Sequence, residues 1–514
     1  MKSYFKKLMS FFIACVFIFL GTSCKEDESA AALDNGEFYT IEMYLPVQSA
    51  TAPLDMDVVE EELNKILKEK INAEVNFTVF NMNEYAGKTS TAISANTKID
   101  LIFTNFERLF FYLDMDALYP LDELFERGYG DAVWDDLASI GDEGERLWEQ
   151  VRYNDGHIYA APNIQILPRT AGFTMTNMEL FDRWLSETET AEASLATLDL
   201  EGVFDTVEAY MQWLKDNDLG NGGQTYGVEI PYFMETFLTF DDLCMGMGVP
   251  GVVDVSAEGT PVVINQFKSD KFKYMLQRLN TWYGSDNGHK NFIPAGDMVM
   301  DSRNCDIMSA RTWKPDEVYS VRKGSKTVYT KTYQFGPSYY YQSYIMGTMW
   351  SIPATSENPG RAMKFLNLLH SDAEIHNLLK YGIEGKHYTL NDKGQAASLA
   401  NSRYNNEAIR WVLGNELIGY PTNLQSSDIF EQVDAINKST QLSPIIGFMF
   451  DRTPVLTEIQ ACTAVSSTYW NMLGPKNYSE ASYNAFIAEL GKAGAQKIID
   501  EKQRQLDAWL AKQK

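Results

Sequence analysis

Residues 38–45, FYTIEMYL, begin an alternation of strands and helices that decides the fold. Residues 56–71 carry apolar side chains at helical spacing, residues 75–79 alternate as a second strand, and a second helix is expected at residues 84–96. The stretch IDLIFT at residues 99–104 is an almost continuous apolar run, typical of a buried strand. Strand, helix, strand, helix, strand in this order predicts a parallel α/β sheet.

Two loops of this predicted sheet are expected to face a ligand. In open parallel sheets, ligands bind beyond the carboxyl ends of the strands. Pro46 is expected to end the first strand, so one such loop follows that strand. The other loop follows residue 104 and contains Asn105, Phe106 and Arg108, which are therefore candidate ligand-binding residues.

The chain is long and strongly acidic. Its 514 residues predict more than one domain, because a domain usually has ~100–200 residues. Lys and Arg number 44 against 70 Asp and Glu, and the formal net charge of -26 repels the phosphate backbone of nucleic acids. The aromatic side chains are not interleaved with basic clusters. We therefore expect no nucleic-acid partner.

The first 24 residues predict export. Three lysines precede an apolar run at residues 8–20 that is too short to span a membrane and typical of a signal peptide. LGTSC at residues 20–24 resembles a bacterial lipobox, although its Leu stands one residue earlier than a lipobox favours. The resemblance implies a signal peptide at residues 1–23 and acylation of Cys24, which would anchor the protein to the outer face of the bacterial cytoplasmic membrane. A plain secretory signal with an unmodified Cys24 is the alternative.

No disulfide framework, metal site or cofactor is predicted. Cys244, Cys305 and Cys462 lie far apart, and the five His residues are scattered. DNDLGNG at residues 216–222 is faintly similar to a calcium-binding loop, but Gly stands at the fifth position and no Glu follows in register. A Gly/Asn turn is the better interpretation of this loop.

Three short motifs resemble one family when they are taken together and in order. They are KIDLIFT at residues 98–104, ALYPLDEL at 117–124 and DGHIYAAP at 155–162. They look like stretches of the extracellular solute-binding lipoproteins that serve ABC importers, of the family 1 type. The block SIPATSENPGRAMKFLNLL at 351–369, with YGIEGKHY at 381–388, is similar to a branch of this family that carries a C-terminal domain of unknown function.

The end of the chain supports the same branch. Gly447, Phe448 and QLDAWL at residues 505–510 are similar to that C-terminal domain. Residues 483–512 predict a long helix or a helix pair, with an apolar stripe that is expected to pack into a core.

The resemblance implies an α/β fold of the two-lobed type II periplasmic-binding class, with hinge crossovers and a helical C-terminal extension. It divides the chain into a signal peptide at 1–23, the lipidated Cys with a flexible spacer at 24–37, a first lobe at 38–165 and 305–350, a second lobe at 166–304 and 351–430, and a C-terminal domain at 431–514. A ligand between the lobes favours the closed state by contacting both.

Sugar binding needs flat aromatic platforms beside polar side chains, because a sugar ring has apolar C–H faces and a rim of hydroxyls. Trp313 lies where the family returns to the first lobe, Tyr340 and Trp350 lie near the next crossing, and Tyr232 follows a predicted strand. These four aromatics join Asn105, Phe106 and Arg108 as candidate ligand-binding residues. Most aromatic residues of such a chain are core or surface residues, which is the alternative for each.

The resemblance implies a monomeric binding protein, not an enzyme, that captures a small solute and delivers it to the membrane subunits of an ABC permease. Within this branch the solute is usually an oligosaccharide. A secreted glycoside hydrolase with paired carboxylates is one alternative, since two suitably spaced acids among 70 are not recognisable from sequence. A surface adhesin is the other.

Overall fold

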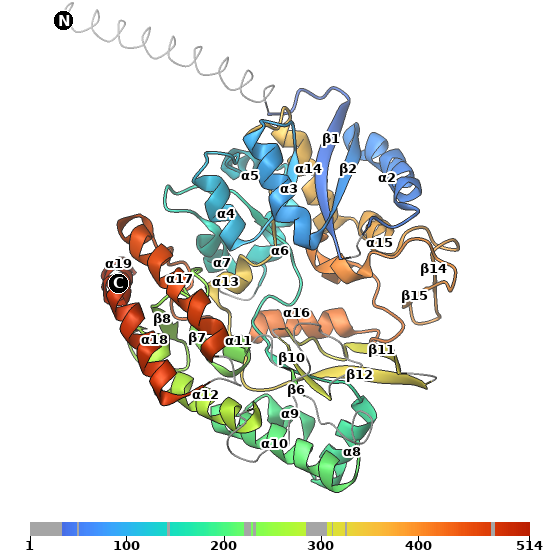
Figure 1. Ribbon diagram of the computed structural model, residues 1–514. Coiled ribbons are helices and arrows are strands. Elements are labelled where there is room, and N and C mark those ends of the chain that lie inside the picture. Colours follow the sequence, from blue (N-terminus) through green and yellow to red (C-terminus); the bar gives the residue numbers. More distant parts are fainter. Residues whose placement is uncertain are drawn as a thin grey trace, which may run out of the picture.

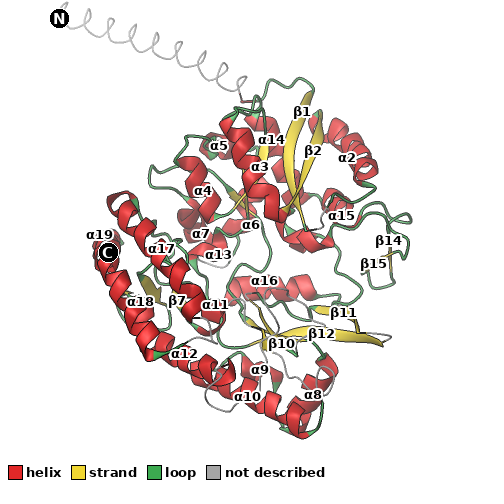
Figure 2. Ribbon diagram, in the orientation of Figure 1, coloured by secondary structure: helices red, strands yellow, loops and turns green. Residues whose placement is uncertain are grey.

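The computed structural model describes residues 33–48, 51–140, 144–219, 228–229, 233–283, 306–310, 312–323, 326–473 and 478–513. It has two lobes, which Figure 1 shows one above the other, and each lobe contains a five-stranded sheet. Helices pack around both sheets (Figure 2). Within these residues, no helix has the length and apolar character that crossing a bilayer requires.

The sheet of the first lobe has the strand order β2-β1-β3-β13-β4. β1 (Tyr39–Val47) runs parallel to β2 (Ala73–Asn81) on one side and to β3 (Leu101–Thr104) on the other. The helices α2 (Met56–Ile71) and α3 (Met82–Ser94) connect these strands. The predicted parallel α/β order is therefore confirmed.

Pro46 lies inside β1, so the prediction that it ends the strand is wrong. It stands opposite Phe80 of β2. The registered pairs between β1 and β3 are at Met43 and Tyr44, before Pro46. β1 therefore has an edge at Pro46, and an edge position tolerates the missing N–H of proline.

The other elements of the first lobe come from two separate stretches of chain. The first stretch supplies α4 (Phe106–Leu113), α5 (Asp122–Glu126), α6 (Asp131–Ala138), α7 (Gly144–Val151) and β4 (Ala161–Pro162). The second supplies β13 (Met349–Ser351), α14 (Pro359–Ser371), α15 (Ala373–Tyr381), β14 (Tyr388–Leu390), β15 (Ala396–Ser398), η3 (Glu407–Val412) and η4 (Glu416–Ile418). β13 inserts antiparallel between β3 and β4, and one apolar cluster joins both stretches.

The sheet of the second lobe has the strand order β11-β12-β5-β10-β6, and β5 pairs antiparallel with both of its neighbours. The elements of this lobe are β5 (Gly172–Met175), α8 (Met178–Glu187), α9 (Glu192–Leu195), α10 (Leu200–Asp216), β6 (Val228–Glu229), α11 (Phe233–Phe237), β7 (Phe240–Asp241), β8 (Val252–Asp254), β9 (Val263–Ile264), η2 (Gln266–Lys268), α12 (Asp270–Tyr283), β10 (Ile307–Ala310), β11 (Val318–Lys323) and β12 (Lys326–Gln334).

The C-terminal helices pack on the second lobe. After α16 (Ile429–Ser439) the chain forms η5 (Thr453–Val455), α17 (Leu456–Leu473), α18 (Glu480–Lys492) and α19 (Ala495–Lys512). The predicted helix or helix pair is thus a pair. Its apolar stripe is buried in the same cluster as the second lobe, which confirms the predicted core role of Phe486, Leu490, Ile498 and Leu506.

Three segments connect the lobes. The first crossing is residues 163–171, the second is residues 335–348 with the short helix α13 (Gln342–Ile345), and the third is residues 426–445 with α16. Isolated backbone bridges join Arg169 to Tyr339 and Tyr340 to Leu442. The three crossings therefore run side by side.

The side chain of Asn437 ties the crossings together. Its Oδ1 accepts from the backbone N–H of Leu167 at 3.0 Å, and its Nδ2 donates to the carbonyl of Gln165 at 2.7 Å. The hydroxyl of Tyr340 donates to the backbone carbonyl of Asn437 at 2.7 Å. One buried residue of the third crossing thus satisfies polar groups of the other two.

Two of the predicted lobe assignments are wrong. Residues 307–334 form β10, β11 and β12 of the second lobe, although residues 305–350 were expected in the first. Residues 351–413 pack into the first lobe, although 351–430 were expected in the second. The reason is strand pairing: β10 and β12 flank β5, whereas β13 fills the gap between β3 and β4 and brings α14 and α15 with it.

The predicted flexible spacer ends earlier than residue 37. Leu33 is buried in the first-lobe cluster, and Asp34 lies 2.6 Å from both Arg361 and Lys364 of α14. Burial raises the pKa of the Asp34 carboxyl, but the hydrogen bonds from Arg361 and Lys364 outweigh burial and hold this pKa well below its ordinary value. The chain is therefore fixed to the first lobe from Leu33 onward, and residues 24–32 lie outside the described part.

Replacing Asn437 should destabilise the protein by loosening the crossings. In Asn437→Ala, the buried N–H of Leu167 and the carbonyl of Gln165 lose their hydrogen-bond partner. Each buried polar group that stays unpaired lowers the free energy of unfolding by ~1–3 kcal/mol. Thermal melts should therefore show a clearly lower midpoint. Lys438→Ala, which removes an exposed side chain from the same helix, is the control and should melt like the unchanged protein. Equal midpoints for both variants would contradict this role of Asn437.

Candidate binding site between the lobes

The crossings meet beside the end of β10, where Trp313 lies. The backbone N–H of Trp313 donates to the carbonyl of Thr170 at 2.7 Å, and Thr170 Oγ1 donates to the carbonyl of Trp313 at 2.7 Å. Arg169, the neighbour of Thr170, pairs with Tyr339 of the second crossing. Trp313 thus lies beside an interlobe crossing, as expected. It belongs to the second lobe, however, so its expected place at a return of the chain to the first lobe is wrong.

The side chain of Trp313 belongs to neither lobe core. It is partly exposed and is absent from the apolar clusters of the described residues. Its indole Nε1 is buried and has no hydrogen-bond partner in the described structure. A buried Trp usually finds a partner for this N–H. A partly open ring with an unpaired donor suits a sugar, which offers both an apolar face and hydroxyl oxygens.

Four charged side chains join the lobes immediately after Trp313, and we call them the interlobe ion network. Lys314 and Glu317 lie between β10 and β11 of the second lobe, whereas Arg410 and Glu416 lie in the first lobe. Lys314 Nζ is 2.5 Å from Glu416 Oε2, and Arg410 Nε is 2.6 Å from Glu416 Oε1. Arg410 also pairs with Glu317. All four residues are at most 8% exposed.

Glu416 and Arg410 of the interlobe ion network have pKa values shifted toward their charged forms. Burial by itself raises the pKa of the Glu416 carboxyl, but the positive charges of Lys314, Arg410 and Lys380 outweigh burial and hold this pKa well below its ordinary value. Burial lowers the pKa of the Arg410 guanidinium, and the charges of Glu416 and Glu317 more than offset it, so this pKa is raised. Glu416 and Arg410 are thus each stabilised by one partner of the second lobe, Lys314 and Glu317 respectively, and by each other.

A pocket of about 350 Å³ opens beside the interlobe ion network. The second lobe lines it with Glu317 to Ser320 at the start of β11, and the first lobe lines it with Ala396 to Ser398 of β15, Thr422 to Gln425, Asn405 and Arg410. Hydroxyl, amide and guanidinium groups surround the partly exposed ring of Tyr319. Two hollows of about 540 Å³ each are lined from one lobe and its crossings. The 350 Å³ pocket draws its walls from both lobes, as capture between lobes requires.

The three consecutive tyrosines at residues 339–341 have different roles. Tyr340 is fully buried and donates to Asn437, so its expected contact with ligand is wrong in this conformation: it is a hinge residue. The guanidinium of Arg169 lies 4.6 Å from the centroid of the Tyr341 ring. The hydroxyl of Tyr341 is buried without a hydrogen-bond partner, and burial raises the pKa of this hydroxyl, which keeps it a donor.

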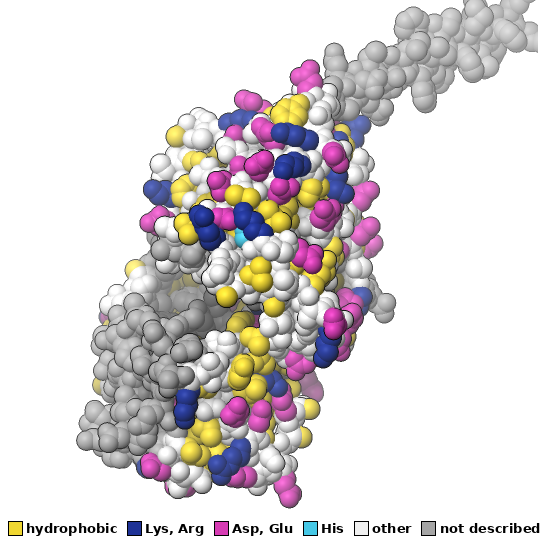
Figure 3. All heavy atoms as spheres, turned by 90° about the vertical axis from the view of Figure 1, so that its right-hand side faces the viewer, with side chains coloured by type: hydrophobic (Ala, Val, Ile, Leu, Met, Phe, Trp, Pro, Cys, Tyr) yellow, Lys and Arg dark blue, Asp and Glu magenta, His cyan; other side chains and the backbone are white. Residues whose placement is uncertain are grey.

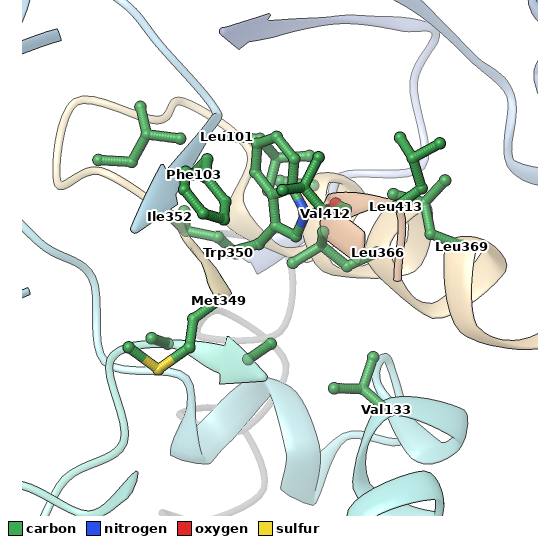
Figure 4. Packing of buried hydrophobic residues seen from close by; sticks show 14 of the residues in the cluster. Leu101, Phe103, Val133, Met349, Trp350, Ile352, Leu366, Leu369, Val412 and Leu413 are labelled. Atoms are coloured by element: carbon green, nitrogen blue, oxygen red, sulfur yellow. Dashed lines mark hydrogen bonds between the residues drawn. The ribbon is translucent and has the colours of Figure 1, made fainter. Parts of the chain in front are cut away.

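Trp350 is a core residue, so its expected place at the ligand is also wrong. It is the central residue of β13 and is fully buried. Its Nε1 donates to the carbonyl of Val412 at 2.6 Å, and its ring meets the edge of Phe103 at 6.0 Å. Figure 4 shows the indole packed between Phe103 and Leu366 in the first-lobe core. The insertion of β13 between β3 and β4 places Trp350 in the interior of the sheet, where residues of the first-lobe cluster cover its side chain.

The loop after β3 holds the remaining candidates, and the structure gives two of them local roles. The side chain of Asn105 caps α4 by accepting from the backbone N–H of Arg108 at 3.0 Å. The guanidinium of Arg108 stacks over the rings of Tyr85 and Phe103, at 5.4 and 5.9 Å from their centroids. Phe106 is partly buried against the first-lobe core. Their contact with a ligand stays a prediction.

Some of the expected features fall outside the described residues. Tyr232 lies outside them, and the loop at 216–222 is described only as far as Leu219. In the described ranges, no group of three or more His, Cys, Asp or Glu side chains is arranged to hold a metal ion. Cys244 and Cys462 are free and buried there.

The sequence did not single out the interlobe ion network. Lys314 and Glu317 flank a Pro-Asp pair directly after Trp313, which reads as an ordinary polar turn. Their partners Arg410 and Glu416 lie about a hundred residues further along the chain. A local pattern therefore carries no signal for this network, because it forms only when the lobes are assembled.

Comparisons with known proteins agree with the two-lobed geometry. Residues 444–511 match the family described as a domain of unknown function, DUF3502. A carbohydrate ABC transporter substrate-binding protein of Streptococcus pneumoniae is 23% identical over 505 residues, which cover 95% of this chain and 94% of that protein.

Solved structures lead to the same group. The N-glycan transport solute binding protein NgtS of Streptococcus pneumoniae superposes with a TM-score of 0.71 at 19% identity, covering 92% of this chain and 100% of that one. Its complex with Man1GlcNAc gives a TM-score of 0.68 at 20% identity with the same coverage. The chain thus has the fold of the solute-binding proteins of ABC importers, resembles a carbohydrate-specific member over nearly its whole length, and ends in a DUF3502 domain.

Proposed function

We propose that this protein is a lipid-anchored binding protein that captures an oligosaccharide between its lobes and delivers it to an ABC permease. The observation that carries the proposal is Trp313, a partly open indole with an unpaired N–H at the meeting point of the crossings. The pocket beside the interlobe ion network, which begins at the residue after Trp313, is lined by both lobes and is rich in hydroxyl and amide groups. Similarity to NgtS, solved with Man1GlcNAc and with Man5GlcNAc, supports a glycan that contains mannose and N-acetylglucosamine.

The surface charge suits a neutral ligand of this kind. On the described part of the face seen in Figure 3, Lys and Arg side chains are interspersed with Asp and Glu, and apolar side chains lie between them. No large patch of one sign is visible on that face. Recognition of a sugar by stacking and hydrogen bonds needs no such patch.

Hydrolysis of the bound glycan is not expected. A glycoside hydrolase needs a carboxylic acid with a raised pKa opposite a second carboxylate in the cleft. At the proposed site both Glu317 and Glu416 are held by cations, and the pKa of Glu416 is lowered. Burial and the charge of Asp242 raise the pKa of Asp241 to about 7, but these two acids are buried inside the second lobe. An adhesin, the other alternative, would not require a pocket between two lobes.

Delivery follows from closure and anchoring. We propose that Cys24 carries the lipid, that the protein works as a monomer on the outer face of the bacterial cytoplasmic membrane, and that the permease recognises the closed form. A ligand that touches both lobes favours closure by its differential affinity for the two states. The nine residues from Cys24 to Ala32, which precede the fixed Leu33, would then tether the lobes to the membrane.

Glycan binding should appear as thermal stabilisation without cleavage. A ligand present at about 100 times its dissociation constant stabilises the folded state by ~2.7 kcal/mol. A thermal-shift screen of the mature protein with Man1GlcNAc, Man5GlcNAc and unrelated oligosaccharides should therefore give a shift of a few degrees for some glycan. Chromatography after incubation should recover that glycan intact. Cleaved product, or no shift with any oligosaccharide, contradicts the proposal.

Trp313→Ala should weaken glycan binding while leaving the empty protein stable. A stacked ring contributes on the order of 1 kcal/mol beyond its buried area, and ~1.4 kcal/mol corresponds to a tenfold change in affinity. Titration calorimetry should show a loss of about tenfold. Trp134→Ala is the matched control, because Trp134 stacks on Trp148 at 4.7 Å within the first lobe. It should lower the melting temperature and leave the affinity unchanged, and the reverse pattern for the two variants would exclude stacking by Trp313.

Cys24→Ala should release the protein from the membrane. Acylation of a single Cys with two chains is sufficient for stable anchoring, and no helix of the described residues provides a span. Cell fractionation should find the variant in the released fraction and the unchanged protein with the membranes. Serine replacement of Cys462, which is buried and free, serves as the control. If the Cys24 variant stays with the membranes, another anchor is present.

A further inference from the structure

The C-terminal domain, residues 444–511, is built into the second lobe. Lys502 of α19 is fully buried and donates to the carbonyl of Gly251 at 2.6 Å. The hydroxyl of Tyr483 donates to the carbonyl of Phe267 at 2.9 Å. The apolar side chains of α18 and α19 belong to the second-lobe cluster. The domain therefore moves with the second lobe.

The same domain also contacts the first lobe. Ile446 is buried in the first-lobe cluster, whereas its neighbour Ile445 is buried in the second-lobe cluster. The N–H of Gly447 donates to the side-chain oxygen of Gln150 on α7 at 2.9 Å. Arg452 pairs with Asp114 at the end of α4 and donates to the carbonyl of Phe110 at 3.3 Å. One short segment thus joins both lobes.

A buried glutamine fixes the second crossing to this segment. The backbone N–H of Gln342 donates to Asp241 Oδ2 at 3.2 Å, which attaches the crossing to β7 of the second lobe. The side chain of Gln342 donates to the carbonyl of Ile445 at 2.8 Å and also to that of Phe448. Gln342 is 1% exposed. The C-terminal domain therefore fixes the direction in which the second crossing leaves the second lobe.

The two sets of contacts between the lobes lie on opposite sides of the molecule. Figure 1 shows α17 to α19 beside α4 and α7 on the left, and β11 with β14 and β15 on the right. The left side is held by a shared apolar residue and by hydrogen bonds of buried groups. The right side is held by the interlobe ion network and contains the 350 Å³ pocket.

Separating the two sides has different physical consequences. Opening the left side exposes Ile446 to water and separates the buried side chain of Gln150 from the N–H of Gly447. Opening the right side separates the Lys314–Glu416 and Arg410–Glu317 pairs, and water solvates the separated charges. Arg410 and Glu416 keep each other as partners in the first lobe. Solvation thus replaces much of what the broken ion pairs lose. The left side therefore resists opening, whereas the right side opens more readily.

We propose that the C-terminal domain is the fulcrum of the lobe motion, and that the interlobe ion network is a latch on the opposite side that opens and reforms as the lobes move. The proposal rests on the proposed function in one respect, which is that the lobe motion serves ligand capture. Gln342 and Arg452 are positioning residues in this arrangement, because they act on the crossing and on α4 and not on the ligand.

Two distances measured by pulsed electron paramagnetic resonance test the proposal without any glycan. One pair of spin labels, carried by encoded unnatural amino acids at Glu61 on α2 and Arg183 on α8, reports on the latch side. The other pair, at Glu107 on α4 and Lys497 on α19, reports on the fulcrum side. All four positions are exposed and lie on helices.

The latch variants Glu317→Gln and Glu416→Gln should shift or broaden the first distance by more than about 2 Å, the scale of a real rearrangement, and leave the second unchanged. Glu317→Gln is the milder change, because Glu416 is more deeply buried and has two cationic partners. Asp434→Asn is the matched control, since it breaks an exposed ion pair within α16, and should change neither distance.

The fulcrum variant Arg452→Ala combined with Gln150→Ala should broaden the second distance, whereas Arg504→Ala, which breaks an exposed pair within α19, should not. The proposal is overturned if the latch variants change both distances equally, if neither latch variant changes the first distance, or if the fulcrum variant leaves the second distance narrow. These distances can be measured on a protein that binds no glycan. Failure of the fulcrum proposal can therefore be distinguished from failure of the proposed function.

Discussion

The side-chain amide of Asn437 holds together chain segments that are 270 residues apart, and the arrangement of the lobes depends on this contact. Three crossings without regular pairing must pass between the lobes, and the buried backbone groups of such segments need partners. Asn437 supplies one acceptor and one donor to the first crossing, while its own carbonyl receives Tyr340 of the second. A side chain with both a donor and an acceptor is required at this position, which an apolar residue could not provide.

Local patterns predicted the beginning of the first lobe well. The helix at Met56–Ile71 has the predicted bounds, because its apolar spacing lies within one stretch of chain. The lobe assignment of residues 305–430 was wrong, because it depends on which distant strands pair with β5 and with β3. For the same reason, the sequence could not distinguish the partly open Trp313 from the core residue Trp350. Both are aromatic residues at a strand, and only the pairing of β13 on both sides shows that Trp350 is enclosed.

Buried charge is distributed unevenly in this protein. Lys314 pairs with Glu416 and Arg410 pairs with Glu317 across the lobe boundary, and these two pairs break if the lobes part. Arg410 and Glu416 also pair with each other within the first lobe. Inside the second lobe, Asp241, Asp242 and Lys502 lie close together, and burial lowers the pKa of Lys502 to about 7 while it raises that of Asp242 to about 6. At the boundary the pKa shifts of Glu416 and Arg410 favour their charged forms, whereas Asp242 and Lys502 inside the second lobe have pKa values close to neutral pH.

The position of β13 has a consequence for how the chain reaches its native state. A ribosome makes the chain from its first residue onward, so β3 and β4 are complete long before residues 349–351 exist. Until β13 arrives, the place between β3 and β4 is empty, and Phe103 and Leu101 lack the indole of Trp350 in their core. Most of the second lobe is synthesised in this interval. Contacts between such distant residues slow folding, and the open edge of β3 is a site for unwanted strand pairing until it is filled. The second lobe can therefore acquire its sheet before the sheet of the N-terminal lobe is complete.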